Sequence, residues 1–400
     1  MEIGTAIVAG HICLDIIPQF DSQTPIDFHS QFQPGSLTRV GPAIFSTGGP
    51  VSNAGLVLHK LGIPTRLVAR IGDDVFGRQV LRIVSGFGEH LAQGIAVLPG
   101  EVTSYSVIIS PPGVDRIFLH CPGANDNFGS GDVPQAWLAS AHLLHFGYPP
   151  VMRRMVEHGG AELERLFCQA KAAGVTTSLD LCSVDPATEA GRLDWGAILA
   201  RTLPFVDLFT PSLDELLFML DRPAFEQAMA KGGIRELLQT EPEMLSALGE
   251  RLLEMGVKIA LIKLGDRGAY LRTARLEKLG DMGRAQPVDP GAWSDRELWA
   301  PCFRVKVVGT TGSGDSTIAG FINALLRSLS PAAALTVAVA VGACNVEAAD
   351  ALSGVPDWGT VQWRIATGWE RLMFENPPRG WIKDNNEQIW IGSRDRYLRE

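Results

Sequence analysis

Short apolar runs along the chain alternate with longer stretches in which apolar residues recur every three or four positions. The clearest helical stretch begins near Pro50 and ends at Gly62. Apolar strands that alternate with amphipathic helices are typical of a parallel sheet covered by helices on both faces. The pattern therefore predicts an α/β fold. The expected strands are 4–9, 12–17, 65–71, 102–109, 116–119, 142–146, 175–181, 205–209, 257–263 and 303–308, and the expected helices are 50–61, 152–173, 187–200, one from about 213, 243–255, 315–328, 331–351 and 357–373.

Three stretches depart from this alternation. Residues 102–119 read as a hairpin around a Pro-Pro-Gly turn, outside the α/β rhythm. Residues 274–300 are polar and rich in Gly and Pro, which predicts an insertion. The tail 376–400 mixes charges with prolines, and we expect Trp381 and Trp390 to pin it to the body.

Composition and charge narrow the class of protein. The chain has 400 residues, 46% hydrophobic and 20% charged, which excludes a mostly disordered chain. Its 35 basic and 44 acidic residues give a formal net charge of −9, so we expect no nucleic-acid and no membrane partner. The six cysteines are scattered without a CxxC pair, as expected of reduced thiols in a cytoplasmic protein. No apolar run reaches the roughly 18 residues that a membrane-spanning helix requires.

The most informative segment is GTTGSGDSTIAGF at residues 309–321. Gly312 and Gly314 let amide groups point to one spot at a helix start, which makes an anion site suited to a transferred phosphoryl group. A carboxylate there would repel phosphate, so Asp315 is a candidate acceptor for the proton of an attacking hydroxyl. An N-cap aspartate after a glycine turn explains the same residues without a ligand. No Lys follows the glycines, which excludes a Walker A loop.

Residues near the N-terminus offer a second candidate site. Gly48 and Gly49 precede a helix and allow close backbone contact with a ligand, and Asn53 could present its amide to sugar hydroxyls. A helix-entry turn with an exposed Asn explains these residues without a ligand, and taken alone they favour that interpretation. Asp15 lies in an apolar strand and needs a partner, which sugar hydroxyls, an arginine or backbone amides would supply.

A third segment, KLGDRGAYL at residues 263–271, reads as a strand, a glycine turn and a strand. It is either an ordinary hairpin or a backbone shelf against a nucleotide.

Together these segments resemble the PfkB, or ribokinase-like, carbohydrate kinase family. Gly48-Gly49 with Asn53, followed by RIGDDVFG at 70–77, looks like the family's N-terminal signature. Residues 309–321 look like its C-terminal signature, usually written DTTGAGD, and residues 264–271 are similar to its nucleotide-side loop. The order and spacing agree over about residues 5–360.

The resemblance implies one Rossmann-like α/β domain over residues 1–375, followed by a C-terminal extension at 376–400. A small β-sheet lid would be built from about 12–45 and 100–125, and residues 274–300 would be an insertion. Sugar would bind between the lid and the core, held by Asp15, Gly48, Gly49 and Asn53. The protein could form a homodimer through the lid.

The resemblance also implies ATP and Mg²⁺ as cofactors. Asp315 matches the family's catalytic base, and the amides of Gly312, Ser313 and Gly314 match its anion hole. Glu215 matches the glutamate of the Asn-x-x-Glu motif, linked indirectly to Mg²⁺. The expected nucleotide-binding residues are Lys263, Gly265, Gly268, Thr310 and Asn345.

Several positions depart from the family pattern. Gly309 stands where the family usually has an aspartate that helps hold a monovalent cation, which makes such a cation doubtful. Ser212 replaces the asparagine of Asn-x-x-Glu, Lys263 stands where threonine is common, and Cys182 lies where many sugar kinases carry an asparagine.

The expected function is an ATP-dependent sugar kinase that transfers the γ-phosphate to a hydroxymethyl group of a carbohydrate. The alternatives are a nucleoside kinase of the same family and a non-catalytic relative that binds a sugar or nucleotide. The substitutions at residues 309, 212 and 182 motivate the last of these.

Overall fold

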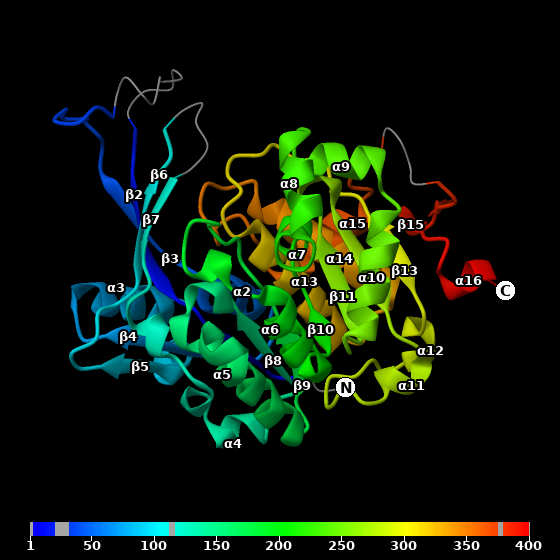
Figure 1. Ribbon diagram of the computed structural model, residues 1–400, viewed down its shortest axis with the longest axis horizontal. Helices are drawn as coiled ribbons and strands as arrows, with labels where there is room; N and C mark the ends of the chain where they lie inside the picture. The colour runs from blue at the N-terminus through cyan, green and yellow to red at the C-terminus, as the bar shows by residue number, and fades with distance from the viewer. Residues whose placement is uncertain (1–2, 21–31, 112–116, 375–378, 400) are drawn as a thin grey trace.

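The computed structural model describes residues 3–20, 32–111, 117–374 and 379–399. An 11-stranded sheet forms the centre of the molecule, and helices cover both of its faces (Figure 1). In spatial order the strands are β14 (Ile382–Asp384), β15 (Ile389–Ile391), β13 (Glu297–Ala300), β12 (Ala269–Thr273), β11 (Ile259–Lys263), β10 (Leu208–Phe209), β9 (Thr176–Leu179), β8 (Leu143–Gly147), β1 (Ala6–Gly10), β4 (Thr65–Gly72) and β5 (Ile95–Leu98).

Seven neighbouring strands, from β11 to β5, run parallel, and the other four add to the sheet antiparallel. The mostly parallel sheet expected from the sequence is therefore confirmed. The longer helices are α2 (Pro50–Lys60), α3 (Val75–Ser85), α5 (Arg153–Ala172), α6 (Trp195–Thr202), α7 (Leu213–Leu220), α8 (Arg222–Ala230), α9 (Ile234–Thr240), α10 (Met244–Glu254), α13 (Ser313–Leu326), α14 (Pro331–Asn345) and α15 (Trp358–Ala366), and the short ones are α4 (Gln135–Leu138), α11 (Leu276–Leu279), α12 (Pro290–Trp293) and α16 (Arg396–Arg399).

Two hydrophobic cores lie on opposite faces of the sheet. In β1 the side chains alternate, so Ala6 and Val8 belong to the core beneath α2, α13 and α14. Ile7 and Ala9 belong to the core beneath α5, α6 and α10. A strand buried on both faces has no polar alternation, which is why these strands read as continuous apolar runs.

The second sheet has four strands and stands away from the body in Figure 1. Its spatial order is β3 (Ala43–Gly48), β2 (Cys13–Pro18), β6 (Tyr105–Ile109) and β7 (Ile117–Cys121). We call this sheet the lid. The expected hairpin is present as the antiparallel pair β6 and β7. Residues 21–31 and 112–116 of the expected lid lie outside the described residues.

Some expected elements were wrong or shifted. No strand forms over 303–308, where only Phe303 makes an isolated bridge, to Arg371. The reason is that β15 pairs with β13 and takes the sheet edge that such a strand would need. Within the expected insertion 274–300, the last four residues form β13 of the main sheet.

Several helices also differ from the expected ones. Helices α14 and α15 end at Asn345 and Ala366 rather than at 351 and 373. Helix α6 starts at Trp195 rather than 187, because Asp194 caps it by accepting a hydrogen bond from the Ala197 amide at 3.0 Å. Helix α5 departs from helical angles at residues 157–160, where Gly159 and Gly160 have positive φ.

The C-terminal tail is part of the main sheet. Strands β14 and β15 extend it beyond β13, and Trp381 packs against Tyr270 and Trp299 with ring centroids about 6 Å apart. Asp395 is fully buried, where it accepts hydrogen bonds from Arg296 Nε at 2.9 Å and from the Glu297 amide at 2.8 Å. The tail is thus fixed by aromatic packing and a buried ion pair.

All six cysteines are free thiols. Within the part of the chain that the structure describes, no helix is both long and apolar enough to cross a membrane.

Candidate active site

The candidate site lies where the carboxyl ends of the parallel strands meet. We call this end of the main sheet its carboxyl edge. Strand β1 has β4 on one side and β8 on the other, so this is the place where the strand order reverses. Crevices at such switch points are the usual ligand sites of open α/β sheets. Tyr148 follows β8, Asp180 follows β9 and Lys263 ends β11 at this edge.

Helix α13 begins at the same edge. Gly312 is its N-cap in a left-handed conformation, with φ of 71°, and a Cβ atom there would lie 2.5 Å from Ala351 Cβ. First-turn amides have no acceptor within their own helix, so they remain available to an anion. Of the three predicted anion-hole residues, Ser313 already donates its amide to Thr310 O, at 3.3 Å. Gly314 lies against the Lys263 side chain.

Asp315 is buried in the first turn of α13, with 2% of its surface exposed. Its Oδ2 accepts two hydrogen bonds, from Asn53 Nδ2 at 2.9 Å and from the Tyr148 hydroxyl at 3.0 Å. Its Oδ1 is buried and has no hydrogen-bond partner within the protein. One carboxylate oxygen is thus fixed, and the other is open to a proton donor.

The protonation of Asp315 is set by opposing effects. Burial raises the pKa of its carboxyl group, while the hydrogen bond from Asn53, the charge of Lys263 and the hydrogen bond from Tyr148 lower it. A raised pKa makes a carboxylate a better proton acceptor in the range where it is still ionised.

Lys263 is the cationic side chain whose charge acts on Asp315. Its Nζ lies 2.6 Å from Asp180 Oδ1, and both side chains are largely buried. Burial acts to lower the pKa of the ammonium, but Asp180 and Glu215 outweigh it and hold the pKa above its ordinary value. Lys263 therefore carries its charge among carboxylates, beside the start of α13.

Glu215 caps helix α7. Its Oε2 accepts the Ser212 amide at 2.7 Å, so the glutamate satisfies the backbone at the start of the helix. Burial raises the pKa of Glu215, and Lys263 opposes this. Among the described residues no cluster of three or more His, Cys, Asp or Glu side chains could hold a metal ion.

The lid presents a polar row toward this site. The strand register pairs Asp15 with Ser46 and with Ser106, and pairs Ser106 with His120. Paired residues share a face of a sheet. Burial raises the pKa of Asp15 to about 6, although hydrogen bonds from Cys13 and Ser106 oppose this.

Gly48 and Gly49 allow close approach of polar side chains. A Cβ atom at Gly48 would lie 2.5 Å from Asp15 Oδ2. Gly49 has a φ of 86°, and a Cβ atom there would lie 2.6 Å from His11 Nδ1. His11 Nε2 lies 3.3 Å from His120 Nε2, and burial lowers the pKa of His11 to about 3. Both glycines are therefore required by the packing of Asp15 and His11.

The expected nucleotide-side residues fall into different surroundings. Gly265 has open space where a side chain would be, and Thr310 is exposed. A Cβ atom at Gly268 would overlap the Ala300 carbonyl oxygen, so this glycine is needed for packing against β13. Asn345 is fully buried, and its Nδ2 donates to the Ala351 carbonyl at 2.7 Å, which fixes the loop after α14.

Comparison with known proteins identifies the family. A family model described as "pfkB family carbohydrate kinase" matches residues 15–358. The chain belongs to the pfkB family. This confirms the resemblance seen in the sequence, and the protein is a phosphotransferase with an alcohol group as acceptor.

Individual members of the pfkB family are distant in sequence. The chain is 24% identical over 317 residues to a 2-dehydro-3-deoxygluconokinase from Thermoproteus tenax, which covers 78% of this chain and 83% of that one. The structure of Arabidopsis thaliana ribokinase complexed with ribose and ATP is similar, with a TM-score of 0.65 and 19% identity over 90% of this chain and 98% of that one. A Burkholderia thailandensis nucleoside kinase in complex with inosine gives a TM-score of 0.63 and 18% identity, over 92% and 100% of the two chains.

Three residues at the site were not among the predicted ones. Tyr148 contacts Asp315, Asp180 pairs with Lys263, and His11 underlies Gly49. Only Asp180 carried a sequence signal, a carboxylate after an apolar strand. His11 and Tyr148 follow strands whose neighbours cannot be known without the sheet order.

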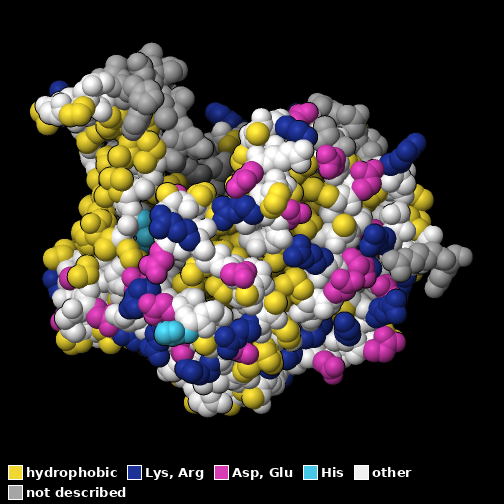
Figure 2. Space-filling model, viewed as in Figure 1, with side chains coloured by type: hydrophobic (Ala, Val, Ile, Leu, Met, Phe, Trp, Pro, Cys, Tyr) yellow, Lys and Arg dark blue, Asp and Glu magenta, His cyan; other side chains and the backbone are white. Residues whose placement is uncertain are grey.

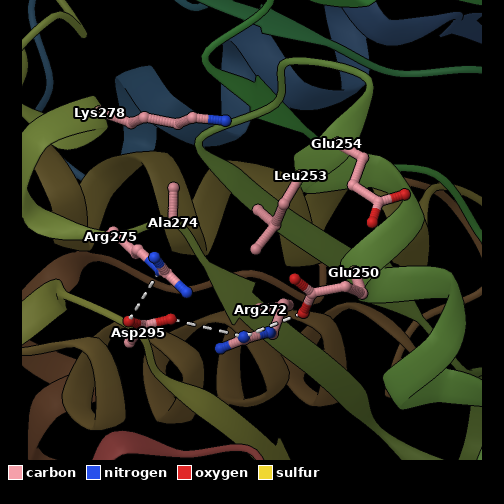
Figure 3. Close-up of a pocket in the computed structure, with 8 residues that line it drawn as sticks. All are labelled: Glu250, Leu253, Glu254, Arg272, Ala274, Arg275, Lys278 and Asp295. Atoms are coloured by element: carbon pink, nitrogen blue, oxygen red, sulfur yellow. Dashed lines mark hydrogen bonds and ion pairs between the residues drawn. The ribbon is translucent and has the colours of Figure 1, made fainter.

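A separate hollow lies between α10 and β12 (Figure 3). It is at the opposite edge of the sheet, since Thr273 pairs with Ile259 at the start of β11, whereas Lys263 ends that strand. Several of its charged groups form ion pairs: Arg272 lies 3.2 Å from Glu250 and 3.5 Å from Asp295. Each of these three side chains has a partner of opposite charge without a ligand.

Proposed function

We propose that the protein transfers the γ-phosphoryl group of ATP to a hydroxymethyl group of a carbohydrate. The observation that carries this proposal is the buried Asp315 carboxylate, with Oδ2 held by Asn53 and Tyr148 and Oδ1 without a partner. A proton acceptor fixed in this way, at a helix start that favours anions, suits the attack of a hydroxyl on a phosphoryl group.

In the proposed reaction, the acceptor hydroxyl gives its proton to Asp315 Oδ1. Its oxygen forms a bond to the γ-phosphorus, the bond from that phosphorus to the β–γ bridging oxygen breaks, and ADP leaves. The amides at the start of α13 and the Lys263 ammonium are placed to stabilise the negative charge on the transferred group. Because these groups are fixed before the reaction, they need no reorganisation during it.

The acceptor is proposed to lie between the lid and β1. Asp15 and the polar row across the lid offer hydrogen-bond partners to sugar hydroxyls. The Asn53 amide is engaged with Asp315, so we assign it to orienting the base, and its predicted contact with sugar hydroxyls stays a prediction. Gly265, Thr310 and Lys263 are the proposed contacts of the nucleotide.

Mg²⁺ fits this site as an ion carried by the nucleotide. It prefers oxygen ligands and retains several waters, and it is commonly bound through substrate phosphates and one or two carboxylates. Glu215 and Asp180 are the buried carboxylates beside Lys263 that would face the ion or its waters. When bound, Mg²⁺ would neutralise charge on the phosphates.

A monovalent cation is not part of this proposal. Gly309 has no carboxylate, and a Cβ atom there would lie 2.9 Å from the carbonyl oxygens of Ala348 and Ala349. We propose that turnover is independent of potassium. Activity in potassium chloride that exceeds activity in tetramethylammonium chloride at the same ionic strength would contradict this.

The second candidate is a nucleoside kinase, supported by the similarity to the Burkholderia thailandensis nucleoside kinase. An assay of ADP release with ATP and Mg²⁺ against sugars, sugar acids and nucleosides separates the two candidates. Preferred turnover of a sugar or sugar acid supports the first, and preferred turnover of a nucleoside supports the second. Ligand binding without turnover of any acceptor would support a non-catalytic relative instead.

We further propose a homodimer through the lid. On the face opposite the polar row, the register places Phe45, Ile16, Val107 and Leu119 in one apolar row. Phe45 and Leu119 are 49% and 55% exposed. Figure 2 shows hydrophobic side chains gathered over this part of the molecule. A second copy would cover an apolar surface that is otherwise in contact with water.

A further inference from the structure

Tyr148 has an unusual backbone conformation. It follows β8 with φ of 65° and ψ of 39°, in the left-handed region. A bulky side chain in this region is strained, at a cost of about 1 kcal/mol or more, and such strain is often found at functional sites. A glycine would remove the strain, yet the chain has a tyrosine whose hydroxyl reaches Asp315.

The surroundings hold Tyr148 in this conformation. The preceding Gly147 packs against Pro50, where a Cβ atom would lie 2.6 Å from the proline ring, and two prolines follow at 149 and 150. The tyrosine ring lies 6.2 Å from the His11 ring, on the acceptor side of the site. The turn after β8 thus directs the ring across the site to the start of α13.

We propose that Tyr148 is a positioning residue for Asp315: its hydroxyl, together with the Asn53 amide, fixes Oδ2 so that Oδ1 faces the acceptor hydroxyl. Two donors on one oxygen restrict the rotation of the carboxylate, whereas one donor alone would leave it free to turn. This inference rests on the proposed function, in which Asp315 takes the proton.

The direction of the hydrogen bond follows from the charges nearby. Burial and the negative charges of Asp315 and Asp180 raise the pKa of Tyr148 well above its ordinary value, so the phenol keeps its proton and donates. The titratable groups that face this pair are His11 after β1, Asp180 after β9, Cys182, and Lys263 at the end of β11. The hydrogen bond from Tyr148 opposes the effect of burial on Asp315, so its loss raises the pKa of Asp315.

The test is Tyr148→Phe, which removes only the hydroxyl. We expect kcat to fall about 10- to 100-fold, as for loss of a hydrogen bond to a charged group, with KM values nearly unchanged. The acid limb of the kcat/KM profile should move to higher pH. The matched control is Tyr270→Phe, because the Tyr270 hydroxyl also donates to a buried carboxylate, Glu297, at 3.0 Å, away from the site.

Two further measurements keep the proposal testable if Tyr148→Phe folds poorly or no acceptor is turned over. Fluorinated tyrosine at position 148 keeps the shape and is a stronger donor, so the acid limb should move to lower pH. Titration of the ¹³C-labelled Asp315 carboxyl, assigned with Asp315→Asn, should show a higher pKa in Tyr148→Phe without requiring turnover. Unchanged kcat and an unchanged Asp315 titration in Tyr148→Phe would overturn the role of Tyr148, whereas turnover retained in Asp315→Asn would overturn the proposed function itself.

Discussion

Asn53 and Asp315 are 262 residues apart in the chain, yet Asn53 Nδ2 lies 2.9 Å from Asp315 Oδ2. They come from α2 and α13, which pack side by side in one helical layer. The two segments that resemble family signatures are therefore joined by this hydrogen bond. It joins the N-terminal part, which carries the lid, to the proposed base at the start of α13.

The two glycines at the start of α13 should respond differently to alanine. Gly312→Ala combines a positive φ with a contact of 2.5 Å to Ala351 Cβ, so we expect a loss of about 2 kcal/mol of unfolding free energy. Gly314→Ala meets Lys263 Cδ only at 3.5 Å and should fold normally, but it should raise KM for ATP because the methyl group would lie beside the proposed phosphate site. Urea denaturation and kinetics measure both.

A double variant separates the two causes of this loss. One is the overlap of the new methyl group with Ala351, and the other is the strain of a residue other than glycine at a positive φ. Gly312→Ala with Ala351→Gly removes the overlapping methyl group and should recover part of the stability. If Gly312→Ala is as stable as the wild type, the left-handed N-cap is not required.

Lys263 and Asp180 should be coupled in stability. Removing either partner leaves the other buried without its counter-charge, so Lys263→Met and Asp180→Asn should each cost about 3 kcal/mol. The double variant should lose less unfolding free energy than the two single variants lose together. A double-mutant cycle by chemical denaturation measures this coupling, and strict additivity would show that the ion pair contributes nothing.

Asp15 should make stability depend on pH. Its pKa rises from 3.8 in the unfolded chain to about 6, so the folded protein binds this proton more tightly. Stability is therefore lost as the pH rises from about 4 to 6, by up to roughly 3 kcal/mol. Asp15→Asn should be more stable than the wild type at pH 8 and similar to it at pH 4.

The control for that experiment is Asp73→Asn, since the Asp73 side chain is 60% exposed. The stability of Asp73→Asn relative to the wild type should not increase with pH. If the difference in unfolding free energy between Asp15→Asn and the wild type does not change with pH, Asp15 is not buried in its ionised form.

The lid should carry the dimer contact. Leu119→Glu puts a charge in the apolar row of the lid, so we expect a dimer in the wild type and a monomer in the variant. Light scattering after size-exclusion chromatography measures the mass. Leu276→Glu is the control, because Leu276 is similarly exposed, at 48%, but lies on α11. A monomeric wild type at micromolar concentration would refute this assembly.

Local patterns were sufficient to predict most of the main sheet and its helices. Apolar runs such as β8 and β11 are buried on both faces, so their composition alone identifies them. Strand β3 was missed because its first three residues, Ala43 to Phe45, are exposed and depend on β2 for pairing. The strand expected at 303–308 failed for a non-local reason, since the tail takes that sheet edge.

The site was predictable where sequence motifs carry it and not where the fold brings residues together. Asp315 and Asn53 belong to motifs, so both were singled out. Tyr148 has no local signal: its role depends on the sheet order and on a left-handed turn that favours glycine. Gly268 is required by the neighbouring backbone at Ala300, so packing alone accounts for this glycine, and its contact with the nucleotide stays a prediction.

The central claim is that Asp315 accepts the proton of the acceptor hydroxyl. The most direct test is turnover of Asp315→Asn, which keeps the shape of the side chain, beside ATP binding measured by calorimetry. The claim predicts a fall in kcat of about 10³-fold, with ATP affinity within about twofold of the wild type. A variant that turns over at close to the wild-type rate would contradict it.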